Sequence, residues 1–226
     1  LTHPDLRAQL GFFAQPFGMQ WGLHAMAQPM PPVLLVSKHG HCLNDLLHRW
    51  STGNLAIDIV AVVSNHAHQR RLSEWHGVPF HHFPVSDANR AEQEVRILDL
   101  MARSGADYLV LARYMQVLSQ DMSGKLAGRC INIHHSFLPG FKGAKPYHRA
   151  QERGVKLIGA TAHFVTSDLD EGPIIEQAVE RVDHRDSVED LIRIGRDGES
   201  QVLSKAVRWV AEQRVLIDGR KTVVFR

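Results

Sequence analysis

The chain carries Cys130-Ile131-Asn132-Ile133-His134-His135-Ser136-Phe137-Leu138-Pro139 just past its midpoint. Isoleucines alternate with polar residues in the first half, which predicts a buried strand that ends in a loop at Pro139. On such a strand Asn132 and His134 share one face and lie about 7 Å apart. Polar groups at the carboxyl end of a strand commonly form the active site of α/β proteins. Taken alone, the stretch is also compatible with two core histidines near a turn.

Short apolar strands and amphipathic helices alternate along the rest of the chain from about residue 32 onward. Strands are predicted at residues 33–37, 57–64, 80–83, 108–112, 130–134, 157–165 and 173–182. Helices are predicted at residues 44–50, 70–76, 87–104, 147–153 and 188–213, with a terminal hairpin at residues 215–225. On the helix at 87–104, Val95, Leu98 and Met101 are expected to face the core. The pattern indicates a doubly wound α/β domain, with a mostly parallel sheet and helices on both faces.

The first 28 residues follow a different pattern. Leucines and phenylalanines recur at helical spacing, at Leu6, Leu10, Phe13 and Phe17. Residues 19–26 then alternate like a strand, and the prolines in residues 29–32 form a stiff linker. One helix and one strand cannot bury a core. We therefore expect either the end of an upstream domain or an arm that packs on the main body.

Composition excludes several classes of function. The chain has 226 residues, of which 44% are hydrophobic and 22% charged, as in an ordinary globular protein. Its formal charge of +2 is too small to indicate a nucleic-acid partner. It has no apolar run near the ~20 residues of a membrane span, so no membrane partner is expected. Cys42 and Cys130 fall within a predicted helix and a predicted strand, which favours reduced core thiols and a cytoplasmic enzyme.

A second polar motif lies downstream, where Asp170-Glu171-Gly172-Pro173-Ile174-Ile175 follows His163-Phe164-Val165. By composition alone it is a solvated connection. Together with Asn-x-His-x-Ser-x-Leu-Pro, however, it resembles the active-site signature of the formyltetrahydrofolate hydrolase and formyltransferase family. The resemblance implies that Asn132, His134 and Asp170 are catalytic.

These three residue types suit the hydrolysis of an N-formyl group. Asn132 offers an amide N–H to the oxyanion, and removal of such a donor typically lowers the rate by ~10²–10³. His134 can transfer protons near neutral pH. Asp170 either binds the attacking water or holds His134 charged against the oxyanion, and the sequence leaves both roles open.

The resemblance also implies a set of substrate contacts. These are Arg90, Met115, Gln116, Val117, Leu118, Val165 and Thr166. In the family the segment around residues 111–118 offers backbone groups to the pterin ring of the folate. Gln116 stands where arginine is usual, so a backbone contact is kept but a guanidinium contact is lost. Without the resemblance, this segment is simply a strand end that enters a loop.

The turn after the first strand distinguishes between family members. Ser37-Lys38-His39-Gly40-His41-Cys42-Leu43 lacks the glycine-rich cradle that would hold a phosphorylated amine acceptor, and it resembles the deformylase segment instead. We therefore expect hydrolysis of 10-formyltetrahydrofolate to tetrahydrofolate and formate, which supplies formate for purine biosynthesis and balances the folate pools. The alternatives are a formyltransferase with an amine acceptor and a folate-binding or amino-acid-sensing protein without catalysis. We do not expect a tRNA acceptor, because no extra domain follows residues 188–226.

The resemblance further implies a domain organisation. We expect residues 1–28 to be the remnant of an ACT-type regulatory domain, residues 29–32 a linker, and residues 33–226 the catalytic domain. We expect no cofactor beyond the folate substrate. We expect the protein to form a homo-oligomer. His39, His41 and Cys42 lie close together in sequence, but they lack a fourth ligand at zinc-like spacing, so we expect no metal site.

Overall fold

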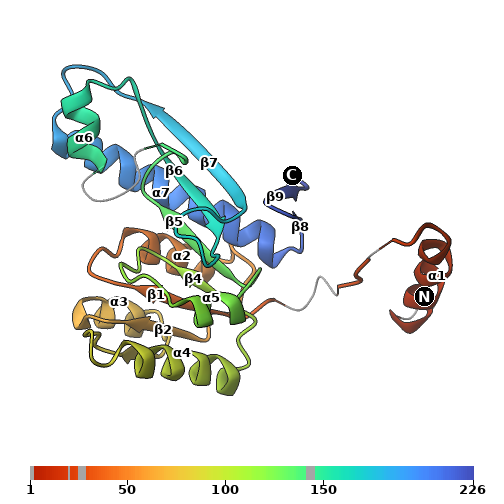
Figure 1. Cartoon of the computed structure of the whole chain (residues 1–226). Coiled ribbons are helices and arrows are strands. Elements are labelled where there is room, and N and C mark those ends of the chain that lie inside the picture. Colours follow the sequence, from red (N-terminus) through yellow and green to blue (C-terminus); the bar gives the residue numbers. More distant parts are fainter. Residues whose placement is uncertain (1–2, 20, 25–28, 141–145) are drawn as a thin grey trace.

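The computed structural model describes residues 3–19, 21–24, 29–140 and 146–226 (Figure 1). The strands of the main sheet are β1 (Pro32–Val36), β2 (Ala61–Ser64), β3 (Phe80–His82), β4 (Tyr108–Leu111), β5 (Cys130–His134), β6 (Leu157–Phe164) and β7 (Ile174–Arg181). The helices are α1 (His3–Ala14), α2 (His41–Ser51), α3 (Arg70–Trp75), α4 (Arg90–Ser104), α5 (Gln120–Lys125), α6 (Pro146–Arg153) and α7 (Val188–Ala211). Two short 3-10 helices, η1 (Gln15–Phe17) and η2 (Ala67–Gln69), and a hairpin of β8 (Val215–Asp218) and β9 (Lys221–Val224) complete the described elements.

The seven strands form one sheet in the order β3-β2-β1-β4-β5-β6-β7. The first five strands in this order are parallel, whereas β6 is antiparallel to both β5 and β7. The prediction of a mostly parallel α/β sheet is therefore confirmed. The chain turns from one half of the sheet to the other between β1 and β4, and such a switch point opens a crevice at the carboxyl ends of the strands.

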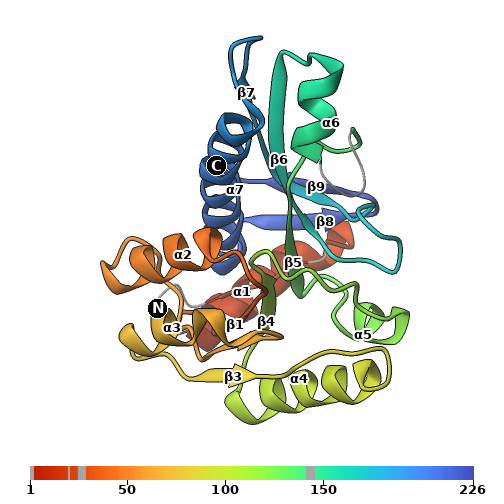
Figure 2. The ribbon, with the colours of Figure 1, turned by 90° about the vertical axis from the view of Figure 1, so that its left-hand side faces the viewer.

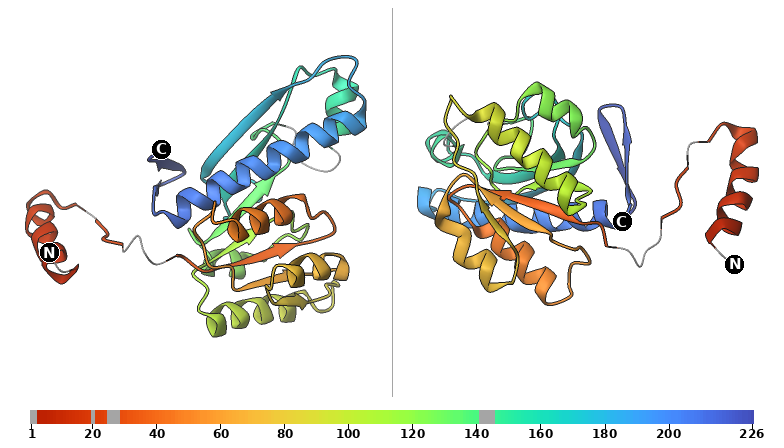
Figure 3. Two further views of the ribbon diagram at one scale, coloured as in Figure 1. Left: turned by 180° about the vertical axis from the view of Figure 1, so that it is seen from behind. Right: turned by 90° about the horizontal axis from the view of Figure 1, so that it is seen from below.

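Alternate residues of the parallel strands enter two separate cores. Leu34, Val62 and Val110 face one core, which α2 and α7 cover. Leu35 and Leu109 face the other, which α4 and α5 cover. Figure 3 shows these helices on the two faces of the sheet, and Figure 2 shows α7 alongside β6 and β7. Because every position of β1, β2 and β4 is buried on one side or the other, these strands are nearly continuous apolar runs.

The structure corrects several details of the predicted elements. Met101 is buried as predicted and Leu98 packs partly buried against the same core, but Val95 is 56% exposed. Helix α4 buries Ile97 instead of Val95, one turn before Met101. The strand predicted at residues 57–64 is shorter, because only Ala61–Ser64 pairs with β1. Helix α5 was not predicted, although the side chain of Ser119 caps it by accepting a hydrogen bond from the Met122 backbone N–H.

The first residues form helix α1, which lies apart from the sheet (Figures 1 and 3). Phe12, Phe13 and Phe17 are exposed on this helix and on η1. Of the strand predicted at residues 19–26, Met19 and residues 21–24 are described and are not in a strand; the rest lies outside the described residues. The assignment of residues 1–28 to an ACT-type domain stays a prediction. Among the described residues, no helix has the length and apolar character of a membrane span.

The corrected face of α4 can be tested by two substitutions. Met101→Ala should lower the free energy of unfolding by about 2–5 kcal/mol, because it leaves a cavity in the core. Val95→Ala removes an exposed side chain and should change it by no more than about 0.5 kcal/mol. Urea unfolding of both variants measures the difference. Equal effects would show that Val95 is packed after all.

Candidate active site

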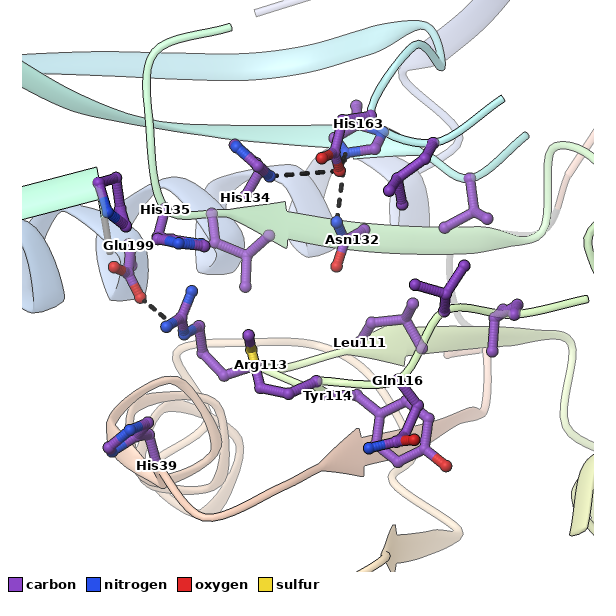
Figure 4. Close-up of a pocket in the computed structure, with 18 of the residues that line it drawn as sticks. His39, Leu111, Arg113, Tyr114, Gln116, Asn132, His134, His135, His163 and Glu199 are labelled. Atoms are coloured by element: carbon purple, nitrogen blue, oxygen red, sulfur yellow. Dashed lines mark hydrogen bonds and ion pairs between the residues drawn. The ribbon is translucent and has the colours of Figure 1, made fainter. Parts of the chain in front are cut away.

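A cavity of about 610 Å³ opens at the carboxyl ends of β4 and β5 (Figure 4). Its lining includes Asn132, His134 and Asp170, so the structure brings the three predicted catalytic residues together. Asn132 and His134 project from β5, and Asp170 reaches the same place from the loop that follows β6. The cavity therefore lies at the carboxyl end of the strand where the sequence analysis predicted the polar groups.

Asn132 is oriented by a neighbour that was not assigned a role from the sequence. His163 lies directly opposite Asn132 in the β5–β6 pairing, and Asn132 Nδ2 is 3.2 Å from His163 Nε2. The Nδ1 of His163 donates to the Phe164 carbonyl oxygen at 2.8 Å, which leaves Nε2 as the acceptor. Burial lowers the pKa of His163 and keeps the ring neutral. The amide thus gives one N–H to His163 and keeps its second N–H for a ligand.

His134 and Asp170 form a hydrogen-bonded pair. His134 Nδ1 is 3.2 Å from Asp170 Oδ1, and both side chains are largely buried. Burial alone would raise the pKa of Asp170. The hydrogen bond and the charge interaction with His134 outweigh burial and hold that pKa below its usual range. The other ring nitrogen, His134 Nε2, is buried and has no hydrogen-bond partner among the described residues. Buried polar atoms are almost always hydrogen-bonded to protein, water or a ligand, so this nitrogen marks a position where a bound molecule would supply the partner.

The loop that carries Asp170 is folded tightly against β6. Asp170 has φ of 58°, a conformation that non-glycine residues rarely adopt. Two residues later, a Cβ on Gly172 would lie 1.7 Å from the Phe164 carbonyl oxygen, so only glycine fits there. The Phe164 backbone N–H donates to the Pro173 carbonyl at 2.9 Å. The strained backbone at Asp170 is held by this close approach, as is common at functional sites.

The predicted substrate-binding segment lines the same cavity. Met115, Gln116, Val117 and Leu118 line it after β4, and Val165 and Thr166 line it after β6. Ser37 Oγ accepts a hydrogen bond from the Met115 backbone N–H at 2.9 Å, and Gln93 Nε2 donates to Tyr114 Oη at 2.6 Å. Arg90 is placed differently, because it does not line the cavity. Its guanidinium lies behind the loop, 3.4 Å from the Val117 carbonyl oxygen.

A buried charge cluster lies at the other end of the cavity. Glu199 is 1% exposed; its Oε1 accepts from Tyr147 Oη at 2.6 Å, and its Oε2 lies 2.7 Å from His41 Nε2 and 3.3 Å from Arg113 Nε. Burial would raise the pKa of Glu199, but the bond with His41 and the charge of Arg113 hold it below its usual range. Sequence analysis missed Glu199, because it lies 158 residues from His41 on a helix where an acidic residue looks solvated.

The same cluster bears on the expectation that no metal is bound. His41, Cys42 and Glu199 offer ligand atoms within 4.8 Å of one another, a third donor that the sequence pattern did not supply. Both carboxylate oxygens are already engaged by protein groups, however, and one of those groups is the guanidinium of Arg113. Burial also raises the pKa of Cys42, which opposes a thiolate ligand. The chemistry of this set favours a charge network over a metal centre.

Comparisons with known proteins agree with this geometry. The formyl transferase family model matches residues 30–207, which contain the sheet and most of its covering helices. A curated formyltetrahydrofolate deformylase from a Corynebacterium species is 52% identical over 98% of this chain and 77% of its own. A crystal structure of the Burkholderia mallei formyltetrahydrofolate deformylase superimposes with a TM-score of 0.94 at 55% identity, over 100% of this chain and 80% of its own. The chain therefore belongs to the formyltetrahydrofolate deformylase family.

A sibling enzyme shares the fold at lower identity. The glycinamide ribonucleotide transformylase 1 structure from Symbiobacterium toebii has a TM-score of 0.83 at 31% identity, over 92% of this chain and 99% of its own. The same architecture therefore occurs in a transformylase. Because the fold is shared, the difference between a deformylase site and a transformylase site has to lie in the side chains of the cavity.

His135 makes the stability of the fold depend on pH. Burial, together with the charges of Arg113 and His134, lowers its pKa to about 4, whereas an unfolded histidine titrates near 6.5. Between these values the unfolded chain binds a proton that the folded chain does not, so stability falls as the pH falls. The slope for one proton is at most about 1.4 kcal/mol per pH unit.

Urea unfolding between about pH 5 and 7 measures this slope. His135→Gln should show a shallower pH dependence than the wild type, because it lacks the group that titrates. His68→Gln removes an exposed histidine and controls for the loss of a ring. Parallel slopes for His135→Gln and the wild type would contradict the prediction.

Proposed function

We propose that the protein hydrolyses 10-formyltetrahydrofolate to tetrahydrofolate and formate. The observation that carries the proposal is the pairing of His134 Nδ1 with Asp170 Oδ1 at 3.2 Å, with His134 Nε2 and the Asn132 amide on the same cavity. The family to which the chain belongs supports the substrate, and the cavity supports the reaction type. These groups supply the proton transfer and the oxyanion donor that hydrolysis of a formamide requires.

We propose a part for each side chain. The Asp170 carboxylate accepts the Nδ1–H of His134, so Nε2 carries the lone pair and can take a proton from water. The water oxygen then forms a bond to the formyl carbon, and the carbonyl oxygen becomes an oxyanion. The Asn132 N–H that His163 leaves unused donates to that oxygen. His134 returns its proton to the folate nitrogen as the carbon–nitrogen bond breaks, which releases tetrahydrofolate and formic acid. The acid then loses the second proton of the water to solvent and leaves as formate.

The substrate is held on one side of these groups. We assign the pterin to the backbone groups of residues 115–118 and to Val165 and Thr166, because all of them line the cavity. Arg90 is given an indirect part, since its guanidinium supports the loop at the Val117 carbonyl. No cofactor is needed for this chemistry, because His134 supplies both the base and the acid.

Further proposals concern the setting of the reaction. The formate released supplies purine biosynthesis, and the tetrahydrofolate returns to the one-carbon pool. We place the enzyme in the cytoplasm, because Cys42 and Cys130 are buried free thiols that suit a reducing compartment. We also propose that it forms a homo-oligomer, which the mass measured in solution tests.

Asp170→Asn tests the catalytic proposal. The amide cannot hold His134 in the required tautomer, so kcat for formate release should fall by about 10²–10⁴-fold. Folate affinity should change less than about threefold, because the carboxylate acts through His134 rather than on the pterin. Steady-state formate production and a folate titration measure the two effects.

Asp168→Asn is the matched control for that substitution. It makes the same chemical change two residues earlier in the same loop, at an exposed position. Its turnover should stay near that of the wild type. Near-normal turnover of Asp170→Asn would sink the mechanism, whereas wild-type formate release that requires an added amine would sink the hydrolase assignment.

Gln116→Ala tests how the pterin is held. If backbone groups make the main contacts, the Michaelis constant should rise less than about threefold. The side chain is half-buried at the edge of the cavity, so its loss leaves the loop anchored by Ser37 and Gln93. A loss of binding of a hundredfold, about 2.7 kcal/mol, would make the Gln116 side chain a principal contact.

A further inference from the structure

The cavity extends past the catalytic groups in two directions. Figure 4 shows Leu111 and Gln116 on one side of Asn132 and His134, and Arg113, His135 and Glu199 on the other. The first side is the one assigned to the pterin. A second substrate that is to receive the formyl group therefore has to approach from the side of Arg113 and Glu199.

A buried carboxylate that faces such a space suits an amine. Glu199 is 1% exposed and ionised, and the charge of an amine would compensate it. Here Arg113 supplies that compensation itself, with Nε 3.3 Å from Oε2 and a side chain only 11% exposed. A guanidinium stays protonated in proteins and cannot act as a nucleophile. The cation that occupies the position is therefore inert toward the formyl group.

The backbone holds Arg113 in place against its own preference. Its φ is 64°. Among the described non-glycine residues that line the cavity, only Arg113 and Asp170 have a positive φ. The Ser37 backbone N–H donates to the Arg113 carbonyl at 3.2 Å, and Ser37 Oγ accepts from the Met115 N–H. Strained conformations of this kind persist where the surroundings fix them, and they cluster at functional sites.

Helix α7 fixes the carboxylate from the other side. A Cβ on Gly195 would lie 2.1 Å from Tyr147 Oη, so glycine leaves the room that the tyrosine needs. One turn further along α7, Glu199 accepts the hydrogen bond of that hydroxyl. Both members of the Arg113–Glu199 pair are therefore held by dedicated contacts.

We propose that Arg113 is a built-in occupant of the amine-acceptor position, and that its pairing with Glu199 is what restricts the reaction to water. The inference rests on the proposed function and names the specificity determinant of that same site. An amine can enter only if it displaces the guanidinium and leaves it unpaired inside the protein. Water needs no such displacement.

Arg113→Gly tests the proposal, because glycine adopts a positive φ freely and leaves the space empty. The probe is glycinamide, a small primary amine, supplied at a fixed concentration with a substrate labelled with ¹³C in the formyl group. In transfer, the amine nitrogen attacks the formyl carbon and loses a proton, the bond to the folate nitrogen breaks, and that nitrogen takes a proton. Formylglycinamide and formate are quantified by NMR.

The wild type should give formate, with no formylglycinamide above the level without enzyme. In Arg113→Gly the ratio of formylglycinamide to formate should rise at least about tenfold. Glycinamide should also raise the melting temperature of Arg113→Gly but not of the wild type, because it compensates the exposed charge of Glu199. This second readout needs no turnover.

Two further variants complete the experiment. Arg113→Gly/Glu199→Gln opens the same space and removes the negative charge of the carboxylate. It should keep a raised product ratio but lose the thermal response to glycinamide. Arg196→Gln removes another cation from the same end of the cavity and should behave as the wild type. If Arg113→Gly fails to fold, the product ratio of the double variant decides.

A wild-type product ratio in the opened variants would overturn the proposal, as would amine transfer by the wild type itself. Formate release by the wild type without any amine tests the proposed hydrolysis separately. The two ideas can therefore fail independently of each other.

Discussion

The antiparallel pairing of β5 with β6 is the constraint on which the active site depends. It places His163 opposite Asn132 and Thr161 opposite His134. Asn132 and His134 thus each have a polar neighbour on the next strand, at the short distance that strand pairing imposes. Thr161 Oγ1 accepts from the Leu138 backbone N–H and donates to the Ser136 carbonyl, which fixes the loop that leaves the site. A one-residue slip would turn Asn132 and His134 away from the cavity.

The site also depends on backbone strain at two points. Arg113 and Asp170 both have positive φ, which costs on the order of 1–3 kcal/mol each for residues with a side chain. Hydrogen bonds from Ser37 hold the first, and the close approach that Gly172 permits holds the second. A rigid sheet with long apolar cores on both faces can sustain such strain, because core packing supplies most of the stability.

The sequence was sufficient for the fold class and for the residues that meet at the site, but not for every contact. Alternation on β5 placed Asn132 and His134 on one face, and the resemblance of two short motifs to the family signature identified Asn132, His134 and Asp170, because both motifs are local. His163 could have been found from the same pattern, but only with the direction of the β5–β6 pairing. Glu199 could not, because its partners come from elements far apart in the chain. The face of α4 was misplaced at Val95, where helical spacing allowed a neighbouring stripe.

The two carboxylates of the cavity need to act without disturbing each other. Asp170 is paired with His134, and Glu199 with Arg113 and His41, so each has cationic or hydrogen-bonding partners of its own. His135 lies next to His134, with ring centroids 5.1 Å apart, and next to Tyr147, the hydroxyl donor to Glu199. With its pKa held near 4, His135 is neutral near pH 7. A neutral ring between the two pairs adds no charge to either, so the proton transfer proposed for His134 leaves the Arg113–Glu199 pair intact.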